Sequence, residues 1–451
     1  MKNDTKLVII NYFQTKVKIG ATMIEKITNE KMSRVFCNTV TKNMIEREDT
    51  SLVFYDMSFL TERINELFQL FPDSTLHAIA VKANPLVNIF KFLKSLNTGV
   101  EAASLSELYL AENVGFPPEK IVFDSPTKTI HELEYAMKLG VHINIDSLDE
   151  LKRIAKLRKG FQTKSSFGIR INPQVGTGAI LSTSVAGDYS KFGVPIKEKK
   201  EELIQYFLEN EWLKGVHLHI GSQGCPVNLL VDGVKVVYDF VIKVNDILKK
   251  NNEDRQINIF DIGGGLPVSN ISDEKTVTML EYREMLGKHC NELFSGKFKL
   301  ITEFGRFIHA NAGWVASRVE YIKESTGIKT IIVHTGADLF LRECYQPEYW
   351  QHDISVLDCE GNIKRGIDKI PYVIAGPLCF AGDILSREIY LPKVAEGDYI
   401  LIHDAGAYTL SMWSRYNSRQ VPKVIGYHND GEKFEILKER ESLDDILRFW
   451  A

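Results

Sequence analysis

The chain has 451 residues, of which 44% are hydrophobic and 25% charged, an ordinary globular composition with room for more than one domain. A net charge of −4 and a pI near 6.3 give no reason to expect binding to nucleic acid or to an anionic membrane. No apolar run approaches the ~20 residues that a transmembrane helix needs.

The N-terminus and the cysteines predict a cytoplasmic protein. The first residues lack the small-residue cleavage site and the sustained apolar core of a secretory signal. No two cysteines have CxxC spacing, which favours reduced thiols over a disulfide framework or a zinc site. The six are Cys37, Cys225, Cys290, Cys344, Cys359 and Cys379.

An alternation of strand-like and helix-like segments begins after a polar lead-in. The lead-in, residues 1–50, contains one candidate strand at 7–13, and an amphipathic helix is expected at 61–70. Strands are then expected at 76–82, 97–102, 119–124, 140–145, 166–172, 214–220, 257–262 and 298–303. Helices are expected at 87–96, 104–114, 129–138, 147–157, 197–208, 228–249 and 278–294, with a further one at 306–319.

Eight strands alternating with helices over about 240 residues predict an α/β fold, a (β/α)8 TIM-like barrel. A doubly wound open sheet is the alternative, but it normally needs fewer units. After residue 320, β-rich runs separated by turn residues predict a C-terminal all-β domain, closed by a helix at 443–450. Three units are expected. Residues 1–50 form an N-terminal segment that contributes to the β domain, residues 51–318 form the barrel, and residues 319–451 form the C-terminal β domain.

Polar side chains gather at the expected strand ends, where the active sites of eightfold barrels lie. Lys82 ends the first barrel strand in the apolar stretch LHAIAVKANP. A lysine whose pKa is lowered by burial can form a Schiff base with a carbonyl cofactor, whereas a solvent-facing lysine is the alternative. The other strand ends bring Glu101, Arg170, His219 with Ser222, Asp261 and Glu303 to the same rim.

Two loops at this rim have the character of a phosphate site. Gly263, Gly264 and Gly265 expose backbone N–H groups that can converge on a phosphate, although a tight turn is the alternative. Gly305 and Arg306 open a helix whose N-terminus favours an anion. A ligand with a phosphate or a carboxylate is therefore expected at this rim.

Glu303 and two histidines leave alternatives open. Glu303 is either a structural partner of Arg306 or, if the ligand contains a pyridine ring, the carboxylate that keeps the ring nitrogen protonated. His217 and His219 are two residues apart in a strand, so they point the same way and only one need be functional.

Nine short motifs resemble, in order, those of the fold-type III pyridoxal phosphate decarboxylases, the family of diaminopimelate, ornithine and arginine decarboxylases. In chain order they are AVKAN, PEKIV, RINP, SKFG, HLHIGSQ, DIGGG, EFGR, GPLCFAGD and GAYT, and the resemblance covers about residues 50–425. The resemblance implies an alanine-racemase-like barrel plus a β domain, pyridoxal 5′-phosphate as the cofactor, an amino acid substrate and a head-to-tail homodimer with shared active sites.

The resemblance also implies roles for individual residues. Lys82 would form the Schiff base, His219 would stack on the cofactor ring, and Glu303 would pair with the pyridine nitrogen. Arg170 and Glu101 would line the cofactor. The phosphate would be held by Ser222, Gly263, Gly264, Gly265, Gly305, Arg306 and Tyr408.

Three further residues are assigned to the dimer by the same resemblance. Cys379 of GPLC would come from the neighbouring subunit and return a proton to Cα after carbon dioxide leaves. Lys191 of SKFG and Asp383 resemble an ion pair across the dimer.

The substrate is predicted from two departures from the family pattern. Arg342 stands in RECYQ where the family usually has RPALY and can still bind a carboxylate together with Arg306, whereas Tyr345 is displaced by one residue. Phe380 follows the cysteine where relatives that take free diamino acids have an acid, and a phenyl ring cannot repay the desolvation of an ammonium group. We therefore expect a citryl-type conjugate such as N-citrylornithine, decarboxylated in siderophore biosynthesis.

Alternative functions remain open at this point. If Phe380 only packs and another loop supplies the acid, a diaminopimelate, ornithine or lysine decarboxylase is the alternative. A catalytically silent regulatory homologue is disfavoured because Lys82 and Cys379 are both retained. A racemase is disfavoured because racemases place an arginine, where this chain has Glu303, at the pyridine nitrogen.

Overall fold

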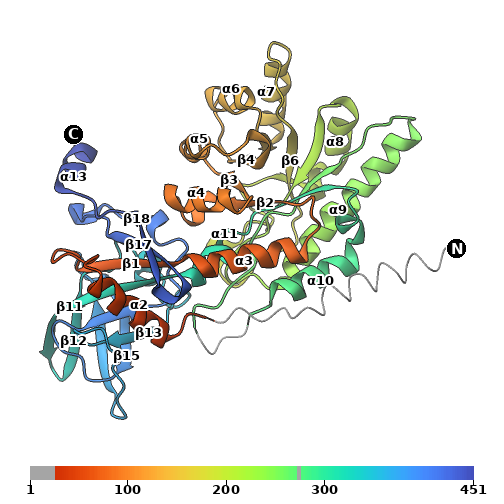
Figure 1. Cartoon of the computed structure of the whole chain (residues 1–451). Coiled ribbons are helices and arrows are strands. Elements are labelled where there is room, and N and C mark those ends of the chain that lie inside the picture. The colour runs from red at the N-terminus through yellow and green to blue at the C-terminus, as the bar shows by residue number, and fades with distance from the viewer. Residues whose placement is uncertain (1–25, 272–275) are drawn as a thin grey trace.

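The protein is built on two sheets, a closed barrel and a separate mixed sheet (Figure 1). The computed structural model describes residues 26–271 and 276–451, so the strand expected at 7–13 lies outside the described residues. Within those two ranges, no helix is long and apolar enough to cross a membrane.

Eight parallel strands form the barrel, which closes because the last strand pairs with the first. The two-residue strand β7 (Val194–Pro195) pairs with one barrel strand outside the ring. The predicted TIM-like barrel is confirmed, with the strands β2 (Leu76–Ala80), β3 (Gly99–Ala102), β4 (Ile121–Asp124), β5 (His142–Ile145), β6 (Phe167–Asn172), β8 (Leu213–His217), β9 (Ile259–Asp261) and β10 (Lys299–Thr302).

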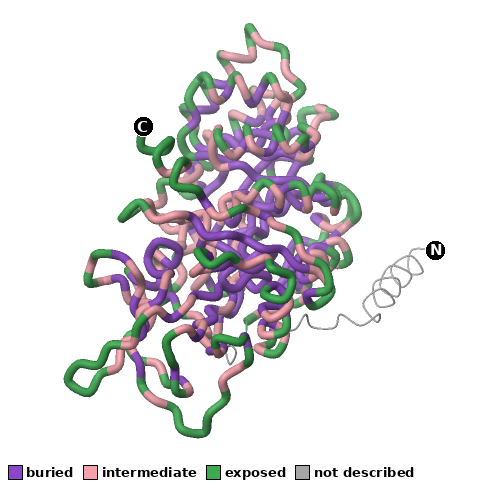
Figure 2. The backbone as a smooth tube through the Cα atoms, turned by 60° about the vertical axis from the view of Figure 1, so that its left-hand side comes forward, coloured by how far each residue is buried: buried purple, intermediate pink, exposed green. Residues whose placement is uncertain are grey.

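Four of the barrel helices begin at serine or threonine caps. Ser104, Thr129, Ser147 and Thr278 each accept a hydrogen bond from a first-turn N–H group, which replaces a bond that the helix itself cannot make. Their apolar faces pack on the strands, and the buried backbone fills the centre of Figure 2. The helices are α3 (Met57–Leu70), α4 (Val87–Ser95), α5 (Leu105–Val114), α6 (Ile130–Leu139), α7 (Leu148–Arg158), α8 (Ile196–Glu209), α9 (Val227–Lys250), α10 (Met279–His289) and α11 (Gly305–His309).

The second sheet confirms the β-rich character expected after residue 320. Strand β1 (Ser51–Asp56) lies at its centre, antiparallel to one neighbour and parallel to the other, although residues 51–56 were expected to open the barrel domain. The other strands are β11 (Gly313–Ser325), β12 (Ile328–Val333), β13 (Ile354–Leu357), β14 (Ile370–Ala375), β15 (Ile384–Leu391), β16 (Tyr399–Ile402), β17 (Lys423–His428) and β18 (Lys433–Lys438). The helices of this part are α2 (Asn29–Thr41), α12 (Leu341–Tyr345) and α13 (Leu443–Trp450).

The helix expected at 306–319 is wrong beyond its first turns. Helix α11 ends at His309, and β11 begins at Gly313. Strand β11 pairs with β1 and with β16, so backbone bonds on both sides outweigh the local apolar spacing that predicted a helix. A Cβ at Gly313 would lie 2.6 Å from the Cα of Gly406, which shows how closely the chain passes its neighbour there.

The two units meet at the rim of the barrel that contains Lys82. The N–H of Tyr408, in the loop after β16, donates to the carbonyl of Ala83, 2.9 Å away. Gly406 in the same loop donates to the carbonyl of Ala310, also at 2.9 Å. The second unit therefore places the GAYT loop directly beside the end of β2.

Candidate active site

Lys82 lies on a short 3-10 helix, Val81–Ala83, immediately after β2. Its Nζ is 2.7 Å from Oε2 of Glu101 on β3, and its side chain is 39% exposed whereas that of Glu101 is fully buried. Burial would lower the pKa of Lys82, but the charges of Glu101 and Glu303 outweigh burial and raise it. The buried carboxylates that face Lys82, and not its own burial, therefore set the direction of its pKa shift.

Glu101 is the buried partner of that lysine. Burial raises the pKa of its carboxyl group to about 8, although the nearby Lys82 charge lowers it. Its Oε1 atom has no hydrogen-bond partner within the described part of the chain. The carboxyl group of Glu101 is thus within hydrogen-bond distance of the lysine nitrogen, 2.7 Å away, where it can accept or return a proton.

Beneath the rim, three charged side chains from separate strands converge. His217, the last residue of β8, has its Nδ1 3.7 Å from Oδ1 of Asp124 and its Nε2 3.7 Å from Oε2 of Glu303. Burial would lower the pKa of His217, but the two carboxylates raise it to about 9. Burial would likewise raise the pKa of Glu303, but His217 lowers it to about 2, so this carboxylate is ionised at neutral pH.

The glycine triplet approaches His219 and Glu303 so closely that no side chain fits. The N–H of Gly264 donates to Nδ1 of His219 at 3.2 Å, and burial lowers the pKa of that histidine to about 3. A Cβ at Gly264 would lie 2.4 Å from the carbonyl oxygen of Glu303, and Gly265 has φ +101°. The triplet is therefore a close backbone approach at the rim as well as a turn.

Two arginines share the faces of two aromatic rings. The guanidinium of Arg306 lies 4.6 Å from the ring centroid of Tyr408 and 5.2 Å from that of Trp350. For Arg342 these distances are 4.9 Å and 4.6 Å. In the two described ranges neither guanidinium forms an ion pair with a carboxylate, and Arg306 Nε donates to Ser222 Oγ at 3.2 Å. The pair is suited to bind anions.

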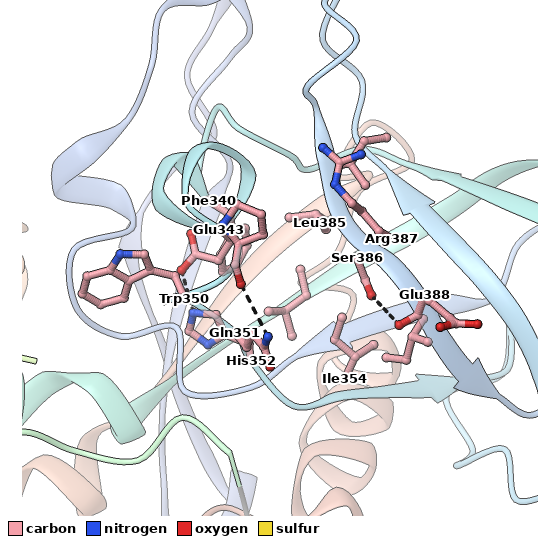
Figure 3. A pocket seen from close by; sticks show the side chains of 14 residues that line it. Phe340, Glu343, Trp350, Gln351, His352, Ile354, Leu385, Ser386, Arg387 and Glu388 are labelled. Carbon is pink, nitrogen blue, oxygen red and sulfur yellow. Dashed lines mark hydrogen bonds and ion pairs between the residues drawn. The ribbon is translucent and has the colours of Figure 1, made fainter. Parts of the chain in front are cut away.

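Glu343, the acid next to Arg342, is held by a different base. Its Oε1 is 2.9 Å from Nε2 of His352, and both side chains are buried. Figure 3 shows this contact at one side of a pocket of about 340 Å³, which Trp350 also lines and which Arg387 and Glu388 of β15 border. Glu343 is thus bonded to His352 and forms no ion pair with Arg342 among the described residues, which leaves the guanidinium of Arg342 for a ligand.

Cys379 and Phe380 lie in the loop after β14, and their contacts stay within the second unit. Cys379 is exposed, its N–H donates to Oδ1 of Asn417 at 2.7 Å, and its carbonyl accepts the Tyr416 hydroxyl at 3.2 Å. The ring of Phe380 packs at 5.7 Å from that of Tyr345 and at 6.0 Å, edge to face, from that of Tyr416. Phe380 and Tyr345 therefore belong to one aromatic cluster.

The two residues expected to pair across a dimer have different surroundings. Asp383 is buried, and its two carboxylate oxygens accept the N–H groups of Ala337 and Leu378, each at 2.6 Å. Lys191 is exposed, and its Nζ lies 4.9 Å from the ring of Phe192. The ion pair between Lys191 and Asp383 stays a prediction.

The chain matches the family described as "Pyridoxal-dependent decarboxylase, pyridoxal binding domain" over residues 58–310. It belongs to this family. A diaminopimelate decarboxylase of Aquifex aeolicus is 31% identical over 409 residues, which cover 90% of this chain and 93% of the relative. A similar enzyme of Helicobacter pylori is 30% identical over 413 residues, 90% of this chain and 97% of that protein.

Solved structures of these decarboxylases share the fold of both units. The crystal structure of diaminopimelate decarboxylase from Helicobacter pylori complexed with L-lysine has a TM-score of 0.77 at 28% identity, covering 91% of this chain and 99% of that one. A co-complex of the Methanocaldococcus jannaschii enzyme with L-lysine also has a TM-score of 0.77 at 28% identity, with 89% and 92% covered. The protein is a pyridoxal phosphate-dependent amino acid decarboxylase.

The residues at the rim fit this cofactor. Glu303 is buried, and its Oε1 lacks a hydrogen-bond partner among residues 26–271 and 276–451, which leaves that oxygen for the pyridine nitrogen. The glycine triplet admits no Cβ, and Arg306 keeps an uncompensated charge. An aromatic nitrogen and a phosphate are the two groups that these features would bind.

The expected citryl-type substrate, and with it the place in siderophore biosynthesis, is wrong. The relatives that match nine tenths of the chain are diaminopimelate decarboxylases. Phe380 packs against Tyr345 and Tyr416, and these ring contacts account for an aromatic side chain at this position without a citryl-type substrate.

The reading of strand ends missed two residues of the site. Asp124 ends β4 as the acid in IVFD, and His217 was set aside in favour of His219. The structure brings both histidines to the site, because β8 ends at His217 and the chain then leaves the strand's alternation. The position of Asp124 at a strand end was the signal available in the sequence.

Proposed function

We propose that the protein decarboxylates diaminopimelate, removing one carboxylate as carbon dioxide and leaving lysine. The observation that supports this most is the pair formed by Arg306 and Arg342 over the rings of Tyr408 and Trp350. Two guanidinium groups without a carboxylate partner in the described ranges match two anionic groups.

The cofactor phosphate supplies one of these two anions. The second must come from a carboxylate that the substrate keeps after decarboxylation. Arg306, bonded to Ser222, would bind the cofactor phosphate, and Arg342 would bind the carboxylate that remains after decarboxylation. Diaminopimelate has such a second carboxylate, whereas ornithine and lysine lose the only one they have. The arginine pair therefore favours diaminopimelate over those two amino acids.

The chain's own residues would divide the work as follows. Pyridoxal phosphate, when bound, supplies a ring that accepts the electron pair left behind by the departing carboxylate. Lys82 would hold the cofactor covalently, and Glu101 would take or return the proton of its Nζ. Ionised Glu303 would keep the ring nitrogen protonated, and His219 would stack on the ring.

The phosphate would be bound by loops of both units. Ser222 and the triplet Gly263, Gly264 and Gly265 come from the barrel, as do Gly305 and Arg306 at the start of α11. Tyr408 comes from the second unit and is tied to the barrel through Ala83. Closure of the site would therefore depend on the contact between the two units.

We infer a cytoplasmic homodimer in which each copy completes the other's site. Cys379 is exposed on a loop that is held by hydrogen bonds to Asn417 and Tyr416. An exposed thiol on an ordered loop could enter the active site of a second copy. This thiol would return a proton to Cα. Lys191 of one copy and Asp383 of the other would pair beside it, and Tyr345 with Phe380 would border the substrate.

Carbon dioxide release from a panel of amino acids tests the proposal. Wild-type enzyme loaded with pyridoxal phosphate is supplied separately with diaminopimelate, ornithine, lysine and arginine, and lysine is quantified as the product of the first. We expect diaminopimelate to give the highest kcat/KM, with one lysine formed for each carbon dioxide released. Faster release from ornithine, lysine or arginine would overturn the proposal.

A further inference from the structure

Charges of alternating sign run through the barrel interior and end at Glu303. Nη1 of Arg170 is 2.9 Å from Oδ2 of Asp124, whose other oxygen is 3.7 Å from His217. His217 is in turn 3.7 Å from Glu303. The order is cation, anion, cation, anion, and all four side chains are buried.

The imidazole of His217 lacks the hydrogen bonds that a buried neutral ring would need among the described residues. It is 0% exposed, and neither of its ring nitrogens has a hydrogen-bond partner in the described parts of the chain. Oδ1 of Asp124 and Oε1 of Glu303 also lack one there. A neutral imidazole would leave several buried polar atoms uncompensated, whereas an imidazolium between two carboxylates is stabilised by both charges.

We propose that His217 is a positioning residue: its buried imidazolium keeps the Glu303 carboxylate ionised and directs one of its oxygens to the histidine, which leaves the other oxygen for the pyridine nitrogen of the cofactor. The proposal rests on the proposed role of Glu303 toward that nitrogen. It extends the alternation by one more cation, the protonated ring.

Other titratable groups face His217 but do not form an ion pair with it among the described residues. Asp261 on β9 adds to the charges that raise the pKa of His217, but its two oxygens accept hydrogen bonds from Asn144 and Gly263. His142 and His219 are neutral, since burial lowers the pKa of each to about 3. The carboxylates of Asp124 and Glu303 are thus the two charges that His217 bridges.

The same three side chains do not form a convincing metal site. Ligand atoms of Asp124, His217 and Glu303 lie within 4.8 Å of one another. However, Arg170 already neutralises Asp124 at 2.9 Å, and the charges of Lys82 and His217 lower the pKa of Glu303. A divalent cation would add charge where cations and anions already balance.

Binding of a cofactor analogue to the apoenzyme tests this role without turnover. The probe is 4′-deoxypyridoxine 5′-phosphate, which has the ring and phosphate but no aldehyde to react with Lys82. His217→Gln keeps a hydrogen-bond donor near the Nε2 position but removes the charge. The matched control is His77→Gln, a buried barrel histidine that contacts Thr302 and whose pKa burial lowers to about 4.

We expect H217Q to bind the probe about tenfold more weakly than wild type at pH 7, because its Glu303 is protonated there. The difference in affinity between H217Q and wild type should narrow as the pH rises and Glu303 of the variant ionises. H77Q should bind the probe as wild type does. Equal affinity and an equal pH profile for H217Q and wild type would overturn the proposal.

Neutron diffraction from the wild-type holoenzyme gives a second readout that needs no variant. We expect deuterium on both ring nitrogens of His217 at pH 7.5, and a bare nitrogen would overturn the proposal. Both results are independent of the substrate, because neither experiment contains one. Failure of the diaminopimelate assignment would therefore leave them unchanged.

Discussion

The barrel rim and the loop after β14 hold their polar groups in opposite ways. At the rim, Lys82 pairs with buried Glu101 from the neighbouring strand β3, and Glu303 faces buried His217 from β8. In the loop, Cys379 is exposed and Phe380 is held by ring contacts. The charged groups at the rim are therefore positioned by contacts within one chain. In the loop after β14, contacts within the chain fix only the packing of Phe380.

Lys82→Ala tests the rim most severely. Without Nζ the covalent link to the cofactor cannot form, so we expect kcat to fall on the order of a thousandfold or more, with loss of the absorbance of the lysine-linked cofactor. Lys91→Ala, at an exposed position of α4, is the matched control and should behave as wild type. Full turnover by K82A would show that the rim is not the site.

Gly264→Ala tests the backbone approach. The added Cβ would lie 2.4 Å from the Glu303 carbonyl oxygen, so the loop must shift, and we expect pyridoxal phosphate affinity to fall about a hundredfold. Equilibrium titration of the apoenzyme with the cofactor measures this. Gly160→Ala, where a Cβ meets nothing within 4 Å, should bind normally. An unchanged affinity for G264A would refute the proposed phosphate loop.

The pH dependence of stability tests the buried charge pair. The folded-state pKa of His217, about 9, exceeds its ordinary value of 6.5, so its contribution is complete below pH 6.5 and disappears as the pH rises through 9. We expect apo H217Q to be less stable than wild type by about 2 kcal/mol at pH 6.5, with the gap closing towards pH 9.5. Urea unfolding across this range measures the gap.

The control for that experiment is His77→Gln. Burial lowers the pKa of His77 to about 4, so this ring is neutral above pH 6.5 in the folded state. Its effect on stability should therefore be constant between pH 7 and pH 9.5. A pH-independent gap for H217Q as well would mean that His217 carries no buried charge.

Phe380→Leu tests the loop and should have the smallest effect. Leucine keeps an apolar contact with Tyr345 and Tyr416, so we expect a stability loss of about 1 kcal/mol and a change in KM for diaminopimelate of less than about threefold. Steady-state kinetics and thermal unfolding of the variant measure both. A tenfold change in KM with unchanged stability would give Phe380 a direct role in substrate choice.

The sequence predicted the features that depend on local pattern. Strand and helix periodicity predicted the eight-stranded barrel, and strand ends predicted a rim containing Lys82, Glu101 and Glu303. It did not predict that His217 would lie between Asp124 and Glu303, because these side chains come from strands far apart in the chain.

Two further errors have a common physical origin. The segment 313–319 has an apolar spacing that suits a helix, but strands β1 and β16 on either side of it make it a strand. The prediction of a citryl-type substrate rests on Phe380, whose ring neighbours Tyr345 and Tyr416 lie far from it in the sequence and cannot be identified there. In both cases partners distant in the sequence decide the outcome.

The kinetics of Arg342→Gln on two substrates test the central claim most directly. Arg342 is proposed to bind the carboxylate that diaminopimelate keeps and that ornithine lacks. We expect R342Q to lose about tenfold to a hundredfold in kcat/KM for diaminopimelate, the cost of one charge-assisted contact, and to keep its low activity on ornithine. Equal losses on both substrates, or a wild-type preference for ornithine, would contradict the account.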